Sequence, residues 1–152
     1  MRDMKWFIVH CAYTPITMDV DAARVDKWHK KNGWSGIGYN YFIKLDGTVE
    51  KGRSLTEFGA HTIGRGANKY SIGVCFAGGM ENNKPKDTIK VDQMFSILRL
   101  FREAQELFPN IKIAGHNQFD KKPCPCFDMR EYAQKHGLKK SEILMDELIY
   151  KL

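Results

Sequence analysis

The sequence predicts an α/β protein in which a mixed central β-sheet of about five strands is flanked by helices. Short apolar runs that are typical of buried strands alternate along the chain with longer segments whose apolar residues recur at helical spacing. In addition, one Asp-Gly dipeptide stands between two strand-like runs, which indicates an antiparallel hairpin. The 152 residues suffice for one hydrophobic core, so we expect a single domain over residues 1–152.

The first strand is expected over Trp6–Cys11, a continuous apolar run that ends before Thr14. Asp19 is a suitable cap for a helix that runs to about Lys31, where Gly33 follows as a stop signal.

The hairpin is expected where Asp46-Gly47 joins two strand-like runs. Residues 38–44 are rich in aromatic and β-branched side chains, and residues 48–50 resume the strand pattern after the dipeptide. We expect both turn residues to adopt a positive φ, as the tight hairpin turn requires. A further strand is predicted over residues 71–76.

A long amphipathic helix is predicted over residues 91–108, and Pro109 ends it. Gly78 and Gly79 separate this helix from the strand before it. The apolar residues that define its expected buried face are Val91, Met94, Phe95, Leu98, Phe101 and Leu107.

The C-terminal part is predicted to hold a strand and two helical segments. Residues 111–114 form a short apolar run, and residues 128–136 predict a helix that Gly137 stops. Residues 141–152 place apolar residues at helical spacing and form a second amphipathic candidate. We expect this segment to cover the core; the alternative is that it binds a partner protein.

Charge and hydropathy exclude some classes of function. The 24 Lys and Arg residues exceed the 18 Asp and Glu residues, which gives a net charge of +6. Such a charge serves solubility or an anionic partner, and the dispersal of the basic residues argues against nucleic acid. No apolar run approaches the roughly 20 residues of a membrane span. The N-terminus does not resemble a signal peptide, so we expect synthesis in the cytoplasm without routine export.

Three residues form a candidate metal site. His10 lies at the end of the first strand, and His116 follows the strand at residues 111–114. Cys124 comes eight residues later, in a loop that two prolines stiffen. Imidazole and thiolate are ligands that suit zinc. This spacing is weak support by itself, because unrelated residues also produce it.

An ordered set of motifs resembles the zinc-dependent N-acetylmuramoyl-L-alanine amidases, in particular the short phage endolysins of a superfamily that includes the peptidoglycan recognition proteins. The resemblance spans about residues 7–132, and the order and spacing of the motifs carry it more than any one motif. The motifs are Phe7-Ile8-Val9-His10-Cys11-Ala12, Trp28-His29-Lys30-Lys31-Asn32-Gly33-Trp34, Ile37-Gly38-Tyr39, Lys44-Leu45-Asp46-Gly47-Thr48-Val49, Gly52-Arg53, Ala60-His61, Ser71-Ile72-Gly73-Val74, Gly78-Gly79, Gly115-His116 and Cys124-Pro125.

The resemblance implies one zinc ion per chain, held by His10, His116 and Cys124, with the fourth position open for water. It also implies that Tyr39 and Lys122 stabilise the oxyanion. The alternatives are that Tyr39 is a core aromatic residue, and that Lys122 is a solvated loop residue whose place the adjacent lysine takes.

One further residue resembles an active-site histidine of the family, a tryptophan is a candidate substrate contact, and one cysteine departs from the family pattern. His61 is expected to contact substrate or the oxyanion, and Trp34 to stack on a sugar; the alternatives are a loop-capping histidine and a core tryptophan. Cys126 stands where many relatives have a small residue. It offers a competing zinc ligand or a redox pair with Cys124, although we expect its side chain to point away from Cys124.

The function that the resemblance implies is hydrolysis of the amide bond between the lactyl group of N-acetylmuramic acid and L-alanine of the stem peptide. The enzyme would be a bacteriolytic phage or prophage endolysin that is made in the cytoplasm, acts on the cell wall after release and works as a monomer on peptidoglycan. Three alternatives remain open: a cytoplasmic amidase that recycles anhydro-muropeptides, a non-catalytic peptidoglycan-binding module, and a regulatory protein that binds another protein.

Overall fold

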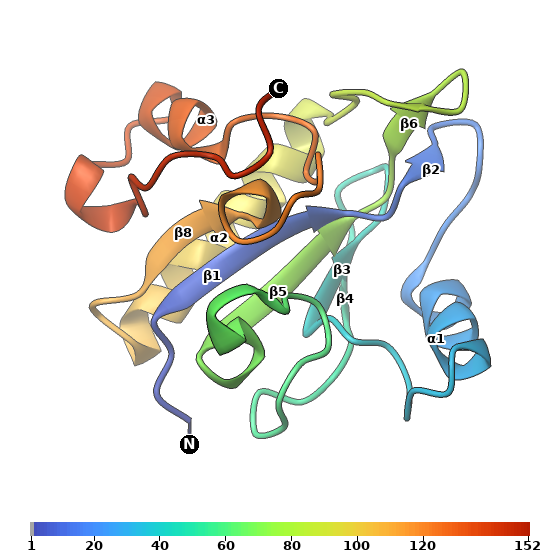
Figure 1. Ribbon diagram of the computed structural model, residues 1–152, viewed down its shortest axis with the longest axis horizontal. Coiled ribbons are helices and arrows are strands. Elements are labelled where there is room, and N and C mark those ends of the chain that lie inside the picture. The colour runs from blue at the N-terminus through green and yellow to red at the C-terminus, as the bar shows by residue number, and fades with distance from the viewer. Residues whose placement is uncertain (1) are drawn as a thin grey trace.

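A five-stranded sheet forms the centre of the molecule, as a computed structural model describes it for residues 2–152 (Figure 1). The strand order is β4-β3-β5-β1-β8. All neighbours are parallel except β3 and β4, which form the predicted hairpin. The mixed sheet expected from the sequence is therefore confirmed. Its strands are β1 (Trp6–Cys11), β3 (Tyr41–Ile43), β4 (Val49–Lys51), β5 (Ser71–Phe76) and β8 (Lys112–Gly115).

The two faces of this sheet carry different side chains because residues alternate along each strand. In β1, Phe7 and Val9 join the larger core cluster, whereas Ile8 belongs to a smaller cluster on the opposite face. Helix α2 (Val91–Leu107) covers the first face and lies behind the sheet in Figure 1. His10 is in phase with Ile8, so it projects from the face that α2 leaves free.

Helix α2 buries a stripe that matches the predicted one only in part: Met94 and Phe101 are buried, and Leu98 packs against the core. Val91 and Phe95 are 67% and 57% exposed, and Leu107 is also exposed. Gln93 explains the rotation of the helix, because its buried side-chain amide donates to the carbonyl oxygens of Lys44 and Ala77. The buried residues of α2 are Gln93, Met94, Ser96, Ile97, Leu100, Phe101 and Ala104.

Helix α1 (Ala22–Lys31) begins two residues later than a cap at Asp19 requires. Asp21 is the cap, and its carboxylate accepts a hydrogen bond from the amide of Arg24 at 2.9 Å. Asp19 contributes only its backbone carbonyl, to the guanidinium of Arg24. The predicted cap was therefore wrong, although the helix itself is present.

The hairpin turn uses three residues, and only one of them has a positive φ. Gly47 has a φ of 88° and donates its amide to the carbonyl of Lys44, while Asp46 is not in the left-handed region. The Asp46 side chain instead accepts the amide of Thr48. A turn followed by one left-handed residue is the common three-residue hairpin loop, so the expectation of two positive φ values was wrong.

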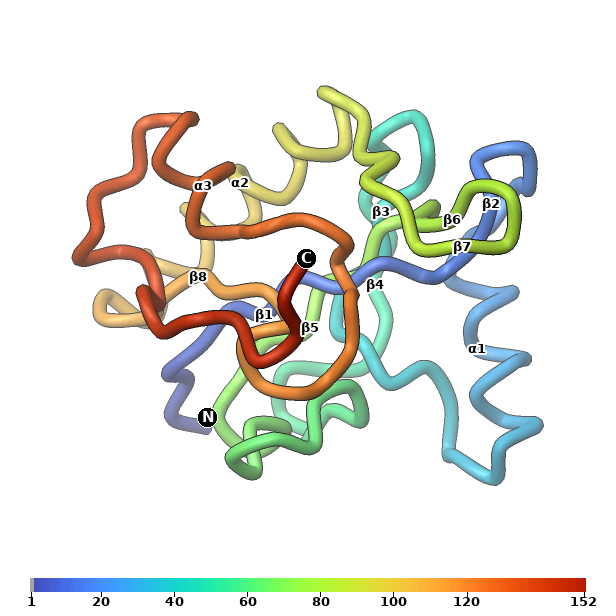
Figure 2. Tube along the Cα trace, turned by 45° about the horizontal axis from the view of Figure 1, so that its top comes forward, coloured from blue at the N-terminus to red at the C-terminus, as the bar shows by residue number. Residues whose placement is uncertain are grey.

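A second, three-stranded sheet was not predicted, because its strands are only two or three residues long. It consists of β2 (Thr14–Pro15), β6 (Gly79–Glu81) and β7 (Lys84–Pro85), and Figure 2 shows it at the end of the molecule near α1. Gly79 has a φ of 95°, and a Cβ there would lie 2.5 Å from the sulfur of Cys11. Glycine therefore lets this sheet approach the end of β1.

The C-terminal segment covers the core, but it is not the predicted helix. After α3 (Met129–Lys135) and a short 3₁₀ turn at Lys140–Glu142, the chain runs extended beside the loop that follows β8 (Figures 1 and 2). The amide of Leu144 donates to Ile113, and that of Ile149 donates to Asn117. These backbone bonds to β8 and its loop replace the bonds that a helix would make.

Among residues 2–152, no helix has the length and apolar character that a membrane crossing requires.

Candidate metal centre and its cavity

His10, His116 and Cys124 converge at one point. Their potential ligand atoms all lie within 4.8 Å of one another, and all three residues are buried. The sheet explains the pairing of the histidines: parallel β1 and β8 place Val9 opposite Gly115, and each histidine is the next residue. The structure thus brings together the three residues that the resemblance implied.

Cys124 reaches the histidines because its loop is braced from within. The side-chain amide of Asn117 donates to the carbonyl oxygens of Phe127 and Pro123, at the two ends of the loop. The amide of Cys11 donates to the Cys124 sulfur at 3.2 Å, which fixes the position of this side chain. The sulfur lies 3.8 Å from Nδ1 of His10.

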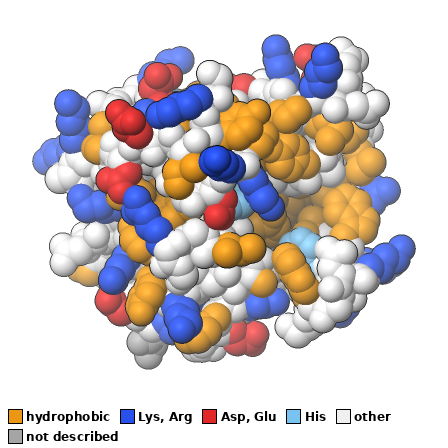
Figure 3. All heavy atoms as spheres, in the orientation of Figure 1, with side chains coloured by type: hydrophobic (Ala, Val, Ile, Leu, Met, Phe, Trp, Pro, Cys, Tyr) orange, Lys and Arg blue, Asp and Glu red, His pale blue; other side chains and the backbone are white. Residues whose placement is uncertain are grey.

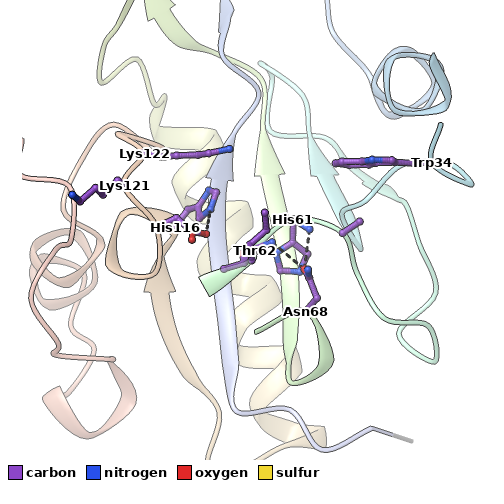
Figure 4. A pocket seen from close by; sticks show the side chains of 10 residues that line it. Trp34, His61, Thr62, Asn68, His116, Lys121 and Lys122 are labelled. Atoms are coloured by element: carbon purple, nitrogen blue, oxygen red, sulfur yellow. Dashed lines mark hydrogen bonds and ion pairs between the residues drawn. The ribbon is translucent and has the colours of Figure 1, made fainter. Parts of the chain in front are cut away.

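Nε2 of each imidazole already has a hydrogen-bond partner, which leaves Nδ1 of each ring for a metal. Nε2 of His10 lies 3.0 Å from Nδ1 of His61 and 3.3 Å from the hydroxyl of Thr62. Nε2 of His116 lies 2.8 Å from a carboxylate oxygen of Asp120, and Figure 4 shows this contact as a dashed line. Metal-binding histidines ordinarily hold their second nitrogen in this way.

Burial keeps these imidazoles neutral. It lowers the pKa of His10 well below the ordinary value, and the neighbouring His116, His61 and Lys122 act in the same direction. The pKa of His116 is also lowered by burial, although Asp120 opposes the shift. Neutral imidazole is the form that binds metal, so two imidazoles and a thiol fit a zinc site with an open fourth position.

A cavity of about 530 Å³ opens over this centre. Figure 3 shows a hollow on this face where histidine side chains reach the surface, with Lys or Arg side chains at its border. Trp34 is 41% exposed and Ile63 is 84% exposed, so both stand at the mouth. The lining residues are Trp34, Ala60, His61, Thr62, Ile63, Asn68, His116, Asp120, Lys121 and Lys122.

The two predicted oxyanion donors differ in their access to the cavity. Lys122 lines the cavity, and in Figure 4 it points across His116, whereas Lys121 points away from it. Tyr39 is not among the lining residues of this described cavity. Its ring packs beside His10 with the centroids 5.1 Å apart. Burial raises the pKa of Tyr39 well above the ordinary value, so its phenol remains a hydrogen-bond donor.

His61 and Trp34 both line the cavity, but they differ in burial. The ring of His61 is packed against His10, and burial lowers the pKa of His61 to about 3. Gly73 provides the space for it, since a Cβ there would lie 2.4 Å from the ring. Trp34 stacks obliquely on His29 and remains open to the cavity, so it does not close the core.

Cys126 is turned away from the metal centre. Its sulfur lies 3.7 Å from that of Cys11 and within 3.4 Å of the carbonyl oxygen of Gly79. The positive φ of Cys126, 76°, accompanies this orientation.

Sequence reasoning missed Asp120, Thr62 and Asn68. Asp120 stands four residues after His116, and that spacing is a signal that was open to use. Thr62 and Asn68 carry no such signal. Asn68 acts through its side-chain oxygen, which accepts the amides of His61 and Thr62 and fixes the cavity wall.

Comparison with known proteins places these features in context. A family model described as N-acetylmuramoyl-L-alanine amidase matches residues 1–127. The endolysin of Enterobacteria phage K11 is 34% identical over 142 residues, which cover 93% of both chains. The endolysin of Klebsiella phage KP32 is 35% identical over the same length and coverage.

Solved structures have the same fold. The endolysin N-acetylmuramoyl-L-alanine amidase LysCS from Clostridium intestinale superimposes with a TM-score of 0.76 at 26% identity, over 91% of this chain and 86% of that chain. Bumblebee PGRP-SA also gives a TM-score of 0.76, at 24% identity, over 97% of this chain and 87% of that chain. The second likeness concerns the fold alone.

Proposed function

This chain belongs to the N-acetylmuramoyl-L-alanine amidase family and is a hydrolase of the endolysin type, and we propose that it works with one zinc ion held by His10, His116 and Cys124. The bond cleaved joins the lactyl group of N-acetylmuramic acid to L-alanine of the peptidoglycan stem peptide. The convergence of these three buried side chains beneath a cavity is the observation that carries the zinc assignment.

The donor set supports zinc. Two neutral imidazoles and one thiolate make a tetrahedral site with one position open, which is the pattern of catalytic zinc. When bound there, zinc would act as a Lewis acid that polarises the amide carbonyl and lowers the pKa of a water molecule. The remaining chemistry falls to the side chains around it.

Tyr39 and Lys122 are proposed to stabilise the negative charge that develops on the carbonyl oxygen. Lys122 carries an ammonium group at the cavity, and the phenol of Tyr39 stays protonated beside His10. Both groups are hydrogen-bond donors, and donors held ready before the reaction are what stabilises such charge efficiently. We further propose that a proton passes to the leaving amine through water or through Tyr39.

Trp34 and His61 are proposed to contact the substrate. Trp34 presents an open ring at the cavity mouth, which suits stacking on a sugar. His61 lines the cavity above His10. The net charge of +6 favours approach to an anionic cell wall. We further propose that the chain acts as a monomer and as one amidase domain over residues 1–152.

The test measures zinc content and product release together. Purified protein is incubated with purified peptidoglycan, with and without a chelator, and released stem peptides are examined for a free N-terminal L-alanine. One zinc per chain and chelator-sensitive release are the expected results. Binding to peptidoglycan without release, after zinc has been restored, would show a non-catalytic module instead.

A second measurement identifies the natural substrate. Rates on intact sacculi are compared with rates on soluble anhydro-muropeptides. An endolysin should prefer the sacculi, whereas a recycling amidase should prefer the soluble fragments. Preference for the fragments would overturn the proposed lytic role and leave the chemistry intact.

A further inference from the structure

Asp120 connects a metal-site histidine to the cavity wall. One oxygen of its carboxylate lies 2.8 Å from Nε2 of His116 and also accepts the backbone amide of Gly64 at 3.3 Å. Asp120 lies in the loop that follows the 3₁₀ turn His116–Gln118, and its side chain is 22% exposed. It is therefore a partly buried carboxylate with two partners at the site.

The environments of the two imidazoles differ in charge. Nε2 of His10 meets only neutral partners, His61 and Thr62. Nε2 of His116 meets a carboxylate, and within residues 2–152 Asp120 is the acidic residue that contacts either ring. A carboxylate on the outer N–H fixes the tautomer of an imidazole and makes its other nitrogen a stronger ligand.

Gly64 allows the cavity wall to lie close to Asp120. A Cβ on Gly64 would lie 2.2 Å from the carbonyl oxygen of Phe119 and 3.0 Å from Asp120. The same wall segment carries His61 and Thr62, which hold His10. Residues 61–64 therefore brace both imidazoles, one directly and the other through Asp120.

We propose that Asp120 is a positioning residue that holds the ring and tautomer of His116 for zinc and links that ring to the cavity wall. This inference rests on the proposed zinc site. It goes beyond the three ligands and two donors, because it makes the zinc affinity of this chain depend on a residue that is not itself a proposed zinc ligand. Asp120 acts only through His116.

The test compares zinc affinity among Asp120→Ala, Asp120→Asn and Asp146→Asn. Asp146 is the matched control, since its carboxylate pairs with Arg65 in the same wall loop but touches neither histidine. Affinity is measured by competition with a chromophoric chelator, and the folding of each metal-free variant is followed by circular dichroism. Asp120→Asn keeps the size of the side chain in case the alanine variant folds poorly.

Asp120→Ala is expected to lower zinc affinity about 10–100-fold, with a smaller loss for Asp120→Asn, because an amide oxygen still accepts the His116 N–H without carrying charge. Asp146→Asn should bind zinc like the unaltered protein. In the zinc-loaded enzyme, Asp120→Ala should lower kcat with little change in KM.

Zinc affinities of both Asp120 variants within about twofold of the unaltered protein, which is far less than a supporting carboxylate normally contributes, would overturn the inference. If the unaltered protein binds zinc and cleaves peptidoglycan in that case, the proposed function stands and only the role of Asp120 is lost. An unaltered protein that binds no zinc would overturn both.

Discussion

The rings of His10 and His116 lie 4.5 Å apart although 105 residues separate them in the chain. Parallel pairing of β1 with β8 produces this proximity, because each histidine follows directly after the paired residues Val9 and Gly115. A slip of one residue in β1 would turn His10 towards α2 and destroy the site. The register of the central sheet is thus a requirement of the chemistry.

Replacement of Cys124 by serine should abolish zinc binding and amide hydrolysis while the fold remains. Serine does not ionise near neutral pH, so the site loses its anionic ligand. Zinc per chain is measured by atomic absorption, and the fold by circular dichroism. Cys126→Ser is the control: its sulfur points to Cys11 and Gly79, and zinc and activity should be retained. Hydrolysis by Cys124→Ser at the normal rate would refute the ligand assignment.

Removal of either oxyanion donor should slow the reaction without loss of zinc. Tyr39→Phe and Lys122→Ala are each expected to lower kcat about 10²–10³-fold, the usual effect of losing one such donor. Steady-state rates on soluble muropeptides provide the measurement. Lys121→Ala serves as the comparison, because Lys121 points away from His116 (Figure 4). An equal loss in Lys121→Ala and none in Lys122→Ala would exchange the roles of the two lysines.

The C-terminal segment should contribute to stability through single buried side chains. Ile143 is almost fully buried, so Ile143→Ala is expected to lower the free energy of unfolding by about 2–4 kcal/mol. Ile149 is largely exposed, and Ile149→Ala should change it by less than about 0.5 kcal/mol. Urea unfolding distinguishes the two. Equal effects would mean that the segment does not dock on the core.

Glu142 should make stability depend on acid pH. Its carboxylate accepts hydrogen bonds from Arg102, the backbone amide of Lys139 and Gln105, and these partners lower the pKa of Glu142 to about 2. Because folding lowers this pKa, the stabilisation that Glu142 provides is complete when the pH is above the ordinary pKa of a glutamate. It is lost as the pH falls towards 2. The contribution is at most about 1 kcal/mol, because Arg102 is half exposed.

The measurement compares Glu142→Gln with the unaltered protein by urea unfolding, in chelator, at pH 7 and near pH 2. The difference in the free energy of unfolding should be present at pH 7 and nearly absent at the lower pH. A difference that persists unchanged at the lower pH would show that the Glu142 charge is not the cause.

The parts of the fold that could be predicted from the sequence are those with local signals. The apolar run of β1 and the Asp46-Gly47 turn each reflect a preference that a few neighbouring residues determine. Residues 141–152 misled because Leu144, Leu148 and Leu152 fit a helical period. The backbone of the segment instead bonds to Ile113 and Asn117. Such distant partners leave no trace in local spacing.

The site residues also fall into those that the sequence could reveal and those that only the folded structure reveals. His10, His116 and Cys124 carry chemistry that the order of motifs made recognisable, and the structure brings them together. Asp120 and Thr62 were not singled out, because their roles depend on where the folded chain places them. Trp34 remained ambiguous between core and cavity until its exposure was known.

The wide sequence separation of the metal-site residues has a consequence for the timing of activity. The ribosome synthesises His10 well before Cys124, and the segment whose backbone amides bond to Ile113 and Asn117 comes later still. A nascent chain that has not yet reached Cys124 therefore lacks one of the three candidate ligands. The proposed zinc site can form only after synthesis has passed this residue.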